Sequence, residues 1–237
     1  TTTAKVYSSF YVASADGVVN FAGDGTSAVF ARKAQLDAGT IATPYQRVTT
    51  YTDYDADPTK FPAYLRFDGV DDALQTGNID FTSTDKMTVW AGFVKTTSTG
   101  QQSLVELSNN WSINSAFVLG ATSGPSNPKS GFGSRGSAGG LAYVQITTSL
   151  GVPLVASAVG GISEDTSSLK INGVTAASVV DQGTGNYGNY PLYIGARAGT
   201  SLFFNGRLYG LIVRGAQSSL SQIEVTELYM KKKVGIA

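Results

Sequence analysis

Short strand-like segments separated by turn signals fill most of this chain, and this pattern constrains the fold more than any other feature. Two longer segments bracket the run. The first, YLRFDGVDDALQTG, begins at Tyr64. Residues 64–67 read as a strand that breaks at Asp68-Gly69, because glycine permits the positive φ of a tight turn, and residues 73–76 resume as a second strand.

The second bracketing segment, PLYIGARAGTSLFFNGRLYGLIVRG, begins at Pro191 and has the same character. Residues 192–195 and 207–214 are strand-like, and the dipeptide Asn205-Gly206 predicts a turn that joins them. The two bracketing segments therefore predict the opening and closing strands of one β-sandwich.

Further strand candidates lie between the brackets at the spacing of an all-β sandwich. In VPLVASAVG, from Val152, neither alternating face is clearly polar, so this strand is predicted to be central or covered on both sides. Trp90 falls inside one candidate and is interpreted as core or inter-subunit packing. The candidates cover residues 86–96, 103–107, 115–121, 141–148, 152–159, 168–173 and 176–180.

The end of the chain predicts a single helix over residues 219–232. Ser221 and Glu224 match the S-x-x-E capping box, and Leu220 is expected to act as a hydrophobic staple. Lys231 to Lys233 suit the negative end of the helix dipole, and Gly235 is expected to stop the helix.

Charge and composition exclude several classes of protein. Seventeen basic and seventeen acidic residues cancel, so no long-range field favours nucleic acid or an anionic membrane. No apolar run approaches ~20 residues, so membrane insertion is not expected. The chain has no cysteine, which is compatible with folding in a bacterial cytoplasm followed by life outside the cell.

The chain is expected to have two unequal parts joined by a connector. Residues 1–48 contain three short strand candidates, a unit too small for a core of its own, and are expected to serve assembly or attachment. Residues 49–62 form a proline-containing connector, and residues 63–237 form the sandwich with its helix. The stretch GPSNPKSGFGSRGSAGG, from Gly124, is predicted to be a mobile or partner-ordered loop.

The sequence offers little for catalysis. With no histidine and no cysteine, the common triads, cysteine nucleophiles and histidine-based zinc sites are absent. None of the four glutamates, Glu106, Glu164, Glu224 and Glu227, has a cleft-forming carboxylate partner at alternating strand spacing. We therefore expect no enzymatic activity, although a carboxylate pair assembled from distant segments stays open.

Two aspartate clusters are candidates for a metal site. Asp53, Asp55 and Asp57 match the start of a calcium loop, but Pro58 stands where glycine is needed, which favours a solvated connector. Asp68, with Asp71 and Asp72, is better explained by turn formation and strand capping. We expect neither a metal nor another cofactor.

Ligand binding is predicted to use aromatic and amide side chains in exposed loops, because sugar rings stack on aromatic faces and hydrogen-bond to amides. Trp111 and Asn110 lie in the polar segment SNNWSINS, and Tyr187 and Tyr190 lie in GTGNYGNYP. The alternative for Trp111 is that its ring folds back and covers one end of the sandwich. Lys129 and Arg135 are weaker candidates for contact with an acidic polysaccharide.

The bracketing segments, together with QLDAGTIATPYQRVTT, NGVTAASVVDQGTGNYGNYPLYIG and the terminal helix, resemble the concanavalin A-like (laminin G-like) jelly-roll domains of phage and prophage virion surface proteins. The resemblance implies an all-β, two-sheet antiparallel jelly-roll sandwich with a short N-terminal β region and a C-terminal helix. It also implies a module of a tail fibre, tailspike or head spike at the virion surface.

That resemblance suggests several partners and leaves three functions open. The first is a receptor-binding module that recognises a host cell-surface glycan. The second is a structural or decoration protein of the virion without a specific ligand, and the third and least favoured is a polysaccharide hydrolase. The expected partners are host surface glycan, other virion proteins and further copies of the chain in a homo-oligomer, as a trimer. The expected location is the virion surface, outside the cell after release.

Overall fold

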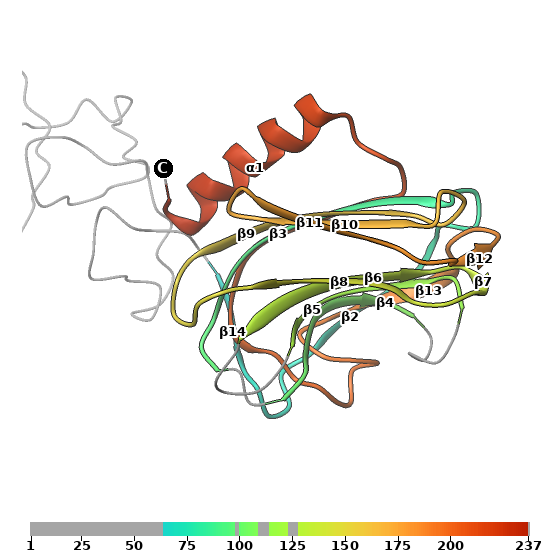
Figure 1. The fold of residues 1–237 in the computed structure, drawn as a ribbon. Helices are drawn as coiled ribbons and strands as arrows, with labels where there is room; N and C mark the ends of the chain where they lie inside the picture. The colour runs from blue at the N-terminus through green and yellow to red at the C-terminus, as the bar shows by residue number, and fades with distance from the viewer. Residues whose placement is uncertain (1–63, 98–99, 109–113, 123–127, 237) are drawn as a thin grey trace, which may run out of the picture. The chain divides into compact units, whose positions relative to one another are not determined.

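The computed structural model describes residues 64–97, 100–108, 114–122 and 128–236 (Figure 1). All of these fall within one unit of the chain, Lys60–Ala237. The expected N-terminal β region at 1–48 and the connector at 49–62 lie outside the described residues. The predicted domain boundaries therefore stay predictions.

The described residues form two antiparallel six-stranded sheets stacked as layers, with one helix on the outer face of the first sheet (Figure 1). This confirms the predicted two-sheet antiparallel sandwich and its terminal helix. The first sheet has the strand order β1 (Leu65–Asp68), β14 (Asn205–Arg214), β3 (Lys86–Lys95), β9 (Leu154–Gly161), β10 (Thr166–Ile171) and β11 (Val174–Val179).

The second sheet faces the first across the core. Its strand order is β2 (Leu74–Asp80), β13 (Asn189–Ile194), β4 (Gln102–Leu107), β5 (Ala116–Thr122), β6 (Lys129–Arg135) and β8 (Ala142–Thr147). A separate two-residue pair joins β7 (Ser137–Ala138) to β12 (Gly183–Thr184).

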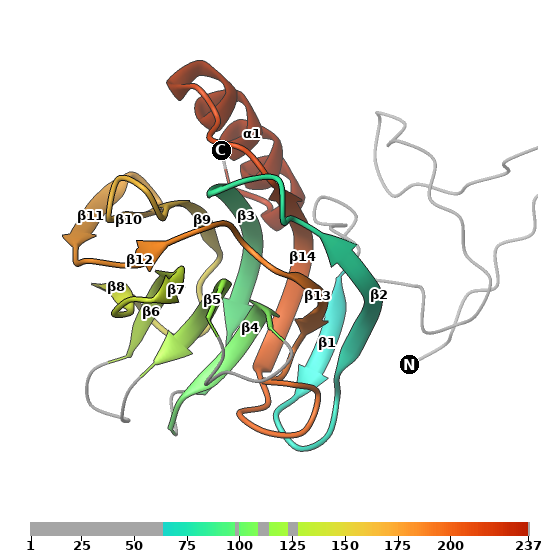
Figure 2. The ribbon, with the colours of Figure 1, turned by 90° about the vertical axis from the view of Figure 1, so that its right-hand side faces the viewer.

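The opening and closing segments pair as the sequence predicts. β1 runs antiparallel to β14, with Leu65 opposite Leu208 and Asp68 opposite Asn205 (Figure 2). Gly69 has φ +81°, which confirms the first predicted turn.

The turn predicted at Asn205-Gly206 is wrong, because both residues lie inside β14. The chain reverses earlier, between β13 and β14, where Gly195, Ala198, Gly199 and Leu202 all have positive φ. Instead of turning, Asn205 donates a hydrogen bond from its side chain to the Asp68 carbonyl at 2.6 Å. A turn dipeptide can thus serve as a strand residue when its amide group has a partner on the neighbouring strand.

The main core lies between the two sheets. Alternate residues of each strand point into it, so that along β9 Ala156 and Ala158 face the core while Val155 faces the helix. β9 lies between β3 and β10 and is covered on both faces, as its sequence predicted. The aromatic residues of this core are Phe67, Phe93, Phe117, Phe132, Tyr187 and Phe204.

The helix α1 spans Leu220–Val234, and its N-cap lies two residues before the predicted cap at Ser221. Ser219 is the N-cap: its hydroxyl accepts from the Gln222 backbone at 3.3 Å, and the Gln222 side chain accepts from the Ser219 backbone at 3.0 Å. The capping box predicted at Ser221 is therefore wrong, and Leu220 is exposed rather than a staple. Gly235 ends the helix in the left-handed conformation at φ 76°, as predicted.

A second, smaller core lies between α1 and the first sheet. Trp90 and Val155 contribute from the sheet, and Met230 and Val234 contribute from the helix. The predicted core position of Trp90 is thus confirmed. In the described part of the chain no helix is long and apolar enough to span a membrane.

The loop predicted from Gly124 to Gly140 is wrong over residues 129–135, while residues 124–127 lie outside the described residues. Residues 129–135 form β6, which lies inside the second sheet between β5 and β8. The segment is a strand because Phe132 points into the core while Gly131 and Gly133 alternate with it on the outer face. Its small residues suggested a loop, but pairing on both sides decides its structure.

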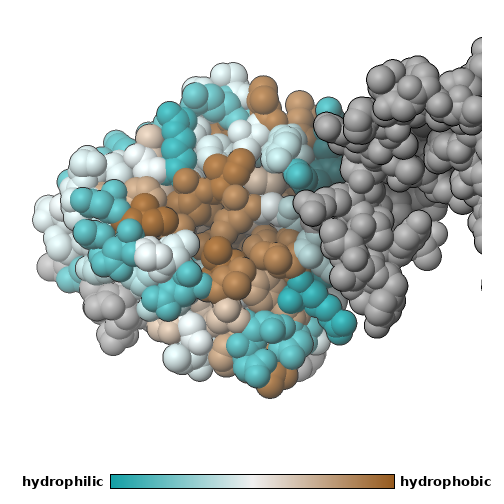
Figure 3. Space-filling view, turned by 180° about the vertical axis from the view of Figure 1, so that it is seen from behind, coloured by the Kyte–Doolittle hydropathy of each residue, from teal (hydrophilic) through white to brown (hydrophobic). Residues whose placement is uncertain are grey.

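In the part of the chain that the structure describes, β1 and β2 are the edge strands of the two sheets on one side of the sandwich. β1 pairs only with Asn205–Leu208, and among the described residues no other strand covers the same edge of β14. Figure 3 shows apolar side chains gathered on this side of the molecule. Leu65, Leu74 and Ile212 are among its exposed apolar residues.

Candidate functional site

Of the four residues predicted to bind a ligand, the structure describes Tyr187 and Tyr190, and neither is an exposed loop residue. Trp111 and Asn110 lie outside the described residues, so their role stays a prediction. Tyr187 is buried, and its hydroxyl shares a hydrogen bond of 2.6 Å with Ser134. Its ring meets Phe117 edge to face at 6.2 Å between centroids.

The predicted exposure of Tyr187 is therefore wrong. Burial raises the pKa of its hydroxyl, as expected for a phenol inside a core. Its neighbours Gly185 and Asn186 are exposed. Their exposure indicates that the backbone lies at the surface, but it does not determine in which direction the Tyr187 side chain points. Tyr190 lies in β13 rather than in a loop and is half-buried against the core.

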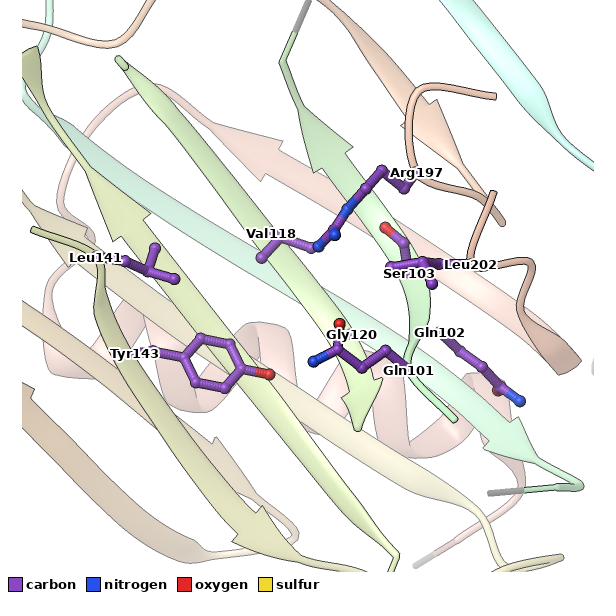
Figure 4. Close-up of a pocket in the computed structure, with 9 residues that line it drawn as sticks. All are labelled: Gln101, Gln102, Ser103, Val118, Gly120, Leu141, Tyr143, Arg197 and Leu202. Atoms are coloured by element: carbon purple, nitrogen blue, oxygen red, sulfur yellow. The ribbon is translucent and has the colours of Figure 1, made fainter. Parts of the chain in front are cut away.

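A pocket of about 180 Å³ lies on the outer face of the second sheet (Figure 4). It is built from β4, β5 and β8, from the residue before β8, and from the connection between β13 and β14. Its lining residues are Gln101, Gln102, Ser103, Val118, Gly120, Leu141, Tyr143, Arg197 and Leu202.

Tyr143 lies flat against the sheet because two glycines of β6 leave room for its ring. A Cβ atom added to Gly131 would lie 2.7 Å from Tyr143 Cζ, and one added to Gly133 would lie 2.7 Å from Cδ2. Figure 4 shows the ring face-on, with its hydroxyl directed toward Gly120 on β5. The ring is half-buried, so one face rests on the sheet and the other is open.

Arg197 reaches into the pocket from the opposite side, where its guanidinium lies beside Val118 (Figure 4). Its Nε is 3.3 Å from Glu106 Oε2. Burial raises the pKa of the Glu106 carboxyl, while the Ser108 hydroxyl and the Arg197 guanidinium act in the opposite direction. The guanidinium is thus fixed in position, and its charge is balanced locally.

Ser103 supplies an unusual polar atom to this pocket. It faces outward from β4 opposite Gly120, and its Oγ is buried without a hydrogen-bond partner. Val118, Leu141 and Leu202 give the rest of the wall an apolar character. The arrangement provides an aromatic face, a positioned guanidinium and a hydroxyl without a partner, which together suit a polar ligand that has an apolar side.

The sequence did not identify Tyr143, Arg197 or Ser103. The alternation Gly131-Phe132-Gly133 was a usable signal, because two glycines on one face of a strand leave a flat floor for an aromatic ring. No local signal pointed to Arg197 or Ser103, which reach the pocket only because β4 and the β13–β14 connection lie side by side.

The aspartates after β1 are arranged as a turn. Asp68 accepts a hydrogen bond from the Val70 backbone at 2.8 Å, and Asp72 accepts one from the Asp68 backbone at 2.9 Å. These bonds confirm the turn role predicted for them. Asp71 joins them in an exposed group with carboxylate oxygens within 4.8 Å of one another. The expectation that no metal is bound stays a prediction, and Asp53, Asp55 and Asp57 lie outside the described residues.

Two solved structures share this architecture. A heptameric SAP-like pentraxin from Limulus polyphemus superimposes with a TM-score of 0.53 at 14% identity, over 68% of this chain and 80% of the pentraxin chain. The enzymatically active domain of bacteriophage CBA120 tailspike protein 2 gives 0.50 at 15% identity, over 70% of this chain and 27% of that one. The fold is a concanavalin A-like jelly roll.

A Ruminococcus gnavus IT-sialidase CBM40, solved with α2,3-sialyllactose, gives a lower TM-score of 0.48 at 17% identity, over 65% of this chain and 97% of that chain. No protein-family model and no curated protein matches the chain. At identities of 14–15%, the likeness of the first two structures establishes the jelly roll alone.

Proposed function

We propose that this jelly roll binds a cell-surface glycan on the outer face of its second sheet, with Tyr143 as the stacking platform. The single observation that carries the proposal is the Tyr143 ring, which lies flat over Gly131 and Gly133 beside a pocket. A pyranose ring has an apolar face that stacks on such a ring and hydroxyls that hydrogen-bond to its surroundings. Gln101, Ser103 and Arg197 supply polar groups within the same pocket.

We propose further that the domain acts at the surface of a virion, as the receptor-binding module of a tail fibre or head spike. The resemblance of the bracketing segments to phage virion surface proteins supports this placement, and the likeness in fold to a tailspike domain is compatible with it. Other virion proteins are then its neighbours, and a homo-oligomer, as a trimer, is its expected state. A structural or decoration protein without a specific ligand is the competing proposal.

Binding without hydrolysis is the activity that the pocket supports. Glycosidases generally use a pair of carboxylates that flank the scissile bond. Within the described residues the pocket has one nearby carboxylate, Glu106, which is fully buried and paired with Arg197. Incubation with host polysaccharide should therefore release no new reducing ends. Release that is lost in Glu106→Gln would contradict this.

Glycan-array binding of the full chain tests the proposal, with three variants compared at equal concentration. Tyr143→Ala should abolish most of the signal, because an aromatic stacking contact contributes on the order of 1 kcal/mol or more. Tyr229→Ala removes an exposed tyrosine from α1 and should leave binding unchanged. If Trp111→Ala abolishes binding and Tyr143→Ala does not, the platform lies at Trp111 instead. If no glycan binds, the decoration protein is favoured.

A further inference from the structure

The walls of the pocket beside Tyr143 are mostly apolar. Val118, Leu141 and Leu202 contribute hydrocarbon surface, and Gly120 contributes backbone without a side chain. Sugar hydroxyls cannot hydrogen-bond to such a surface and would lose their hydration on entry. The pocket therefore fits a small apolar substituent of a sugar better than another hydroxyl.

One hydroxyl group in this wall lacks a hydrogen-bond acceptor, which a ligand can supply. Ser103 Oγ is buried without a partner, and an unsatisfied buried hydroxyl is unfavourable in the free protein. A ligand carbonyl oxygen that accepts its hydrogen relieves this cost. The pocket thus combines hydrocarbon contacts with a hydroxyl donor that has no partner in the protein.

The charge in the pocket favours an uncharged group. Arg197 is the one charged residue among the described residues that line it, and the Glu106 carboxylate lies 3.3 Å from the Arg197 Nε. A ligand carboxylate beside Arg197 would also lie near Glu106, whose like charge opposes it. A neutral amide meets no such opposition.

The spacing of the strands matches an amino sugar. Gly131, Gly120 and Ser103 are direct neighbours across β6, β5 and β4. Two strand spacings, roughly 10 Å, therefore separate Ser103 from the glycine under the Tyr143 ring. Gly120 contributes no side chain between them, and a Cβ atom added to it would lie 2.6 Å from the Gln102 carbonyl oxygen. A pyranose stacked on Tyr143 can direct a substituent across Gly120 toward Ser103.

We propose that this pocket recognises the 2-acetamido group of an N-acetylated amino sugar. The acetamido methyl packs among Val118, Leu141 and Leu202, and its carbonyl oxygen accepts a hydrogen bond from Ser103 Oγ. This inference rests on the glycan-binding function proposed above and specifies the class of sugar.

Saturation-transfer difference NMR on the full chain tests it with three matched pairs of monosaccharides. The pairs are N-acetylglucosamine and glucose, N-acetylgalactosamine and galactose, and N-acetylmannosamine and mannose. Within at least one pair the acetylated sugar should bind about tenfold more tightly, the combined effect of one buried methyl and one hydrogen bond. Its acetyl methyl should receive the strongest saturation of all its protons.

Ser103→Ala should remove most of this preference within a pair, while Tyr143→Ala should weaken both members. Ser167→Ala is the matched control, because Ser167 Oγ is also buried without a partner but lies on β10 of the other sheet. Thermal melts should show no loss of stability in either serine variant, because each removes a buried hydroxyl without a partner, and a lowered melting temperature would reveal a structural effect.

Two outcomes overturn the inference, and they are distinguishable. If sugars bind in a Tyr143-dependent way with equal affinity within every pair, the acetamido assignment is wrong and the glycan-binding function survives. If neither these sugars nor a wider glycan array gives binding, the glycan-binding function itself fails and the acetamido assignment fails with it.

Discussion

The most distinctive residue-scale feature of this domain is the space that two glycines of β6 leave on the outer face of the sheet. Gly131 and Gly133 have ordinary strand conformations, so neither is needed for an unusual φ. Their role is the space above them, which the Tyr143 ring occupies. Leu141 also reaches this space, 3.0 Å from a Cβ built on Gly133. The candidate site therefore depends on the absence of side chains at these two positions of β6.

Gly131→Ala should weaken sugar binding several-fold without unfolding the domain. The new methyl would collide with the hydroxyl end of Tyr143, which can swing away because it is the free end of a side chain. Alanine in a strand costs little, so the melting temperature should stay close to that of the parent. Titration with the best-binding glycan measures the effect. Gly77→Ala serves as control, because nothing lies within 4 Å of its added Cβ.

Lys95 gives the stability of the domain a dependence on pH. It is fully buried at the end of β3, where Nζ donates a hydrogen bond of 2.8 Å to the Lys129 carbonyl. Burial lowers the pKa of its ammonium group from 10.5 to about 8. Between these two values the unfolded chain binds a proton that the folded chain does not, so the free energy of unfolding should rise with pH.

The rise between pH 7.5 and pH 9.5 should be on the order of 2 kcal/mol relative to a Lys95→Met variant, which lacks the titrating group. Urea unfolding of both chains at the two pH values measures it. Subtracting the variant removes contributions from other groups, such as the tyrosines. Parallel curves for the two chains would show that Lys95 keeps an ordinary pKa.

At the scale of elements, α1 is held to the first sheet by few but specific contacts. Met230 and Val234 are its two buried residues, and both pack with Trp90 and Val155. Glu227 adds an ion pair of 2.8 Å with Lys170 and a hydrogen bond from Ser157. Most of the other apolar residues of the helix, such as Leu228, are exposed.

Met230→Ala should lower the free energy of unfolding by about 2–4 kcal/mol, because it empties the centre of this small core. Leu228→Ala, on the exposed side of the same helix, should change it by less than about 0.5 kcal/mol. Chemical denaturation of the two variants under the same conditions gives the comparison. Similar losses in both would mean that the helix does not dock through Met230.

The position of the N-cap can be tested separately. Ser219→Ala removes the hydroxyl that accepts from the Gln222 backbone and should cost about 1 kcal/mol. Ser221→Ala lies inside the first turn and should be close to neutral. Paired thermal melts measure both. A larger loss of stability in Ser221→Ala than in Ser219→Ala would show that Ser221 is the N-cap, as the S-x-x-E pattern predicted.

The strands differed in how well the sequence could predict them. β3 and β9 were predictable because neither face of either strand is clearly polar, which is typical of a strand covered on both sides. β6 was not predictable, because its glycines and serines have low strand propensity on their own. It is a strand because β5 and β8 pair with it on both sides. This pairing depends on the arrangement of the sheet and not on the strand propensity of the residues in β6.

At the scale of the whole molecule, the sandwich followed from the two bracketing segments, but the candidate site did not. Ser103, Tyr143 and Arg197 come from three distant segments that meet only through the strand order of the second sheet. Strand order depends on pairing across the sheet, which no local pattern encodes. The loop segment GTGNYGNYP therefore pointed to Tyr187, which the fold buries, and no such loop pattern surrounds Tyr143.

We expect the full chain to form a homo-oligomer of three copies, a trimer. Three short N-terminal strand candidates have too few residues for a core of their own, so they are expected to find partners on other copies. Multi-angle light scattering at micromolar concentration should give a mass about three times that of the 24.7 kDa chain. A single species at the monomer mass would contradict this expectation.

The pairing of β1 with β14 also has a kinetic consequence. Leu65 and Leu208 are partners although 143 positions separate them (208 − 65). β1 therefore cannot pair until β14 has been synthesised. During synthesis, β1 stays without its partner until the ribosome has released β14, up to Arg214, and β2 stays without its partner until β13, up to Ile194, has been released. Long-range pairing of this kind makes folding slow and leaves strand edges available for misassembly. A chain shortened before β14 should therefore aggregate rather than fold in part.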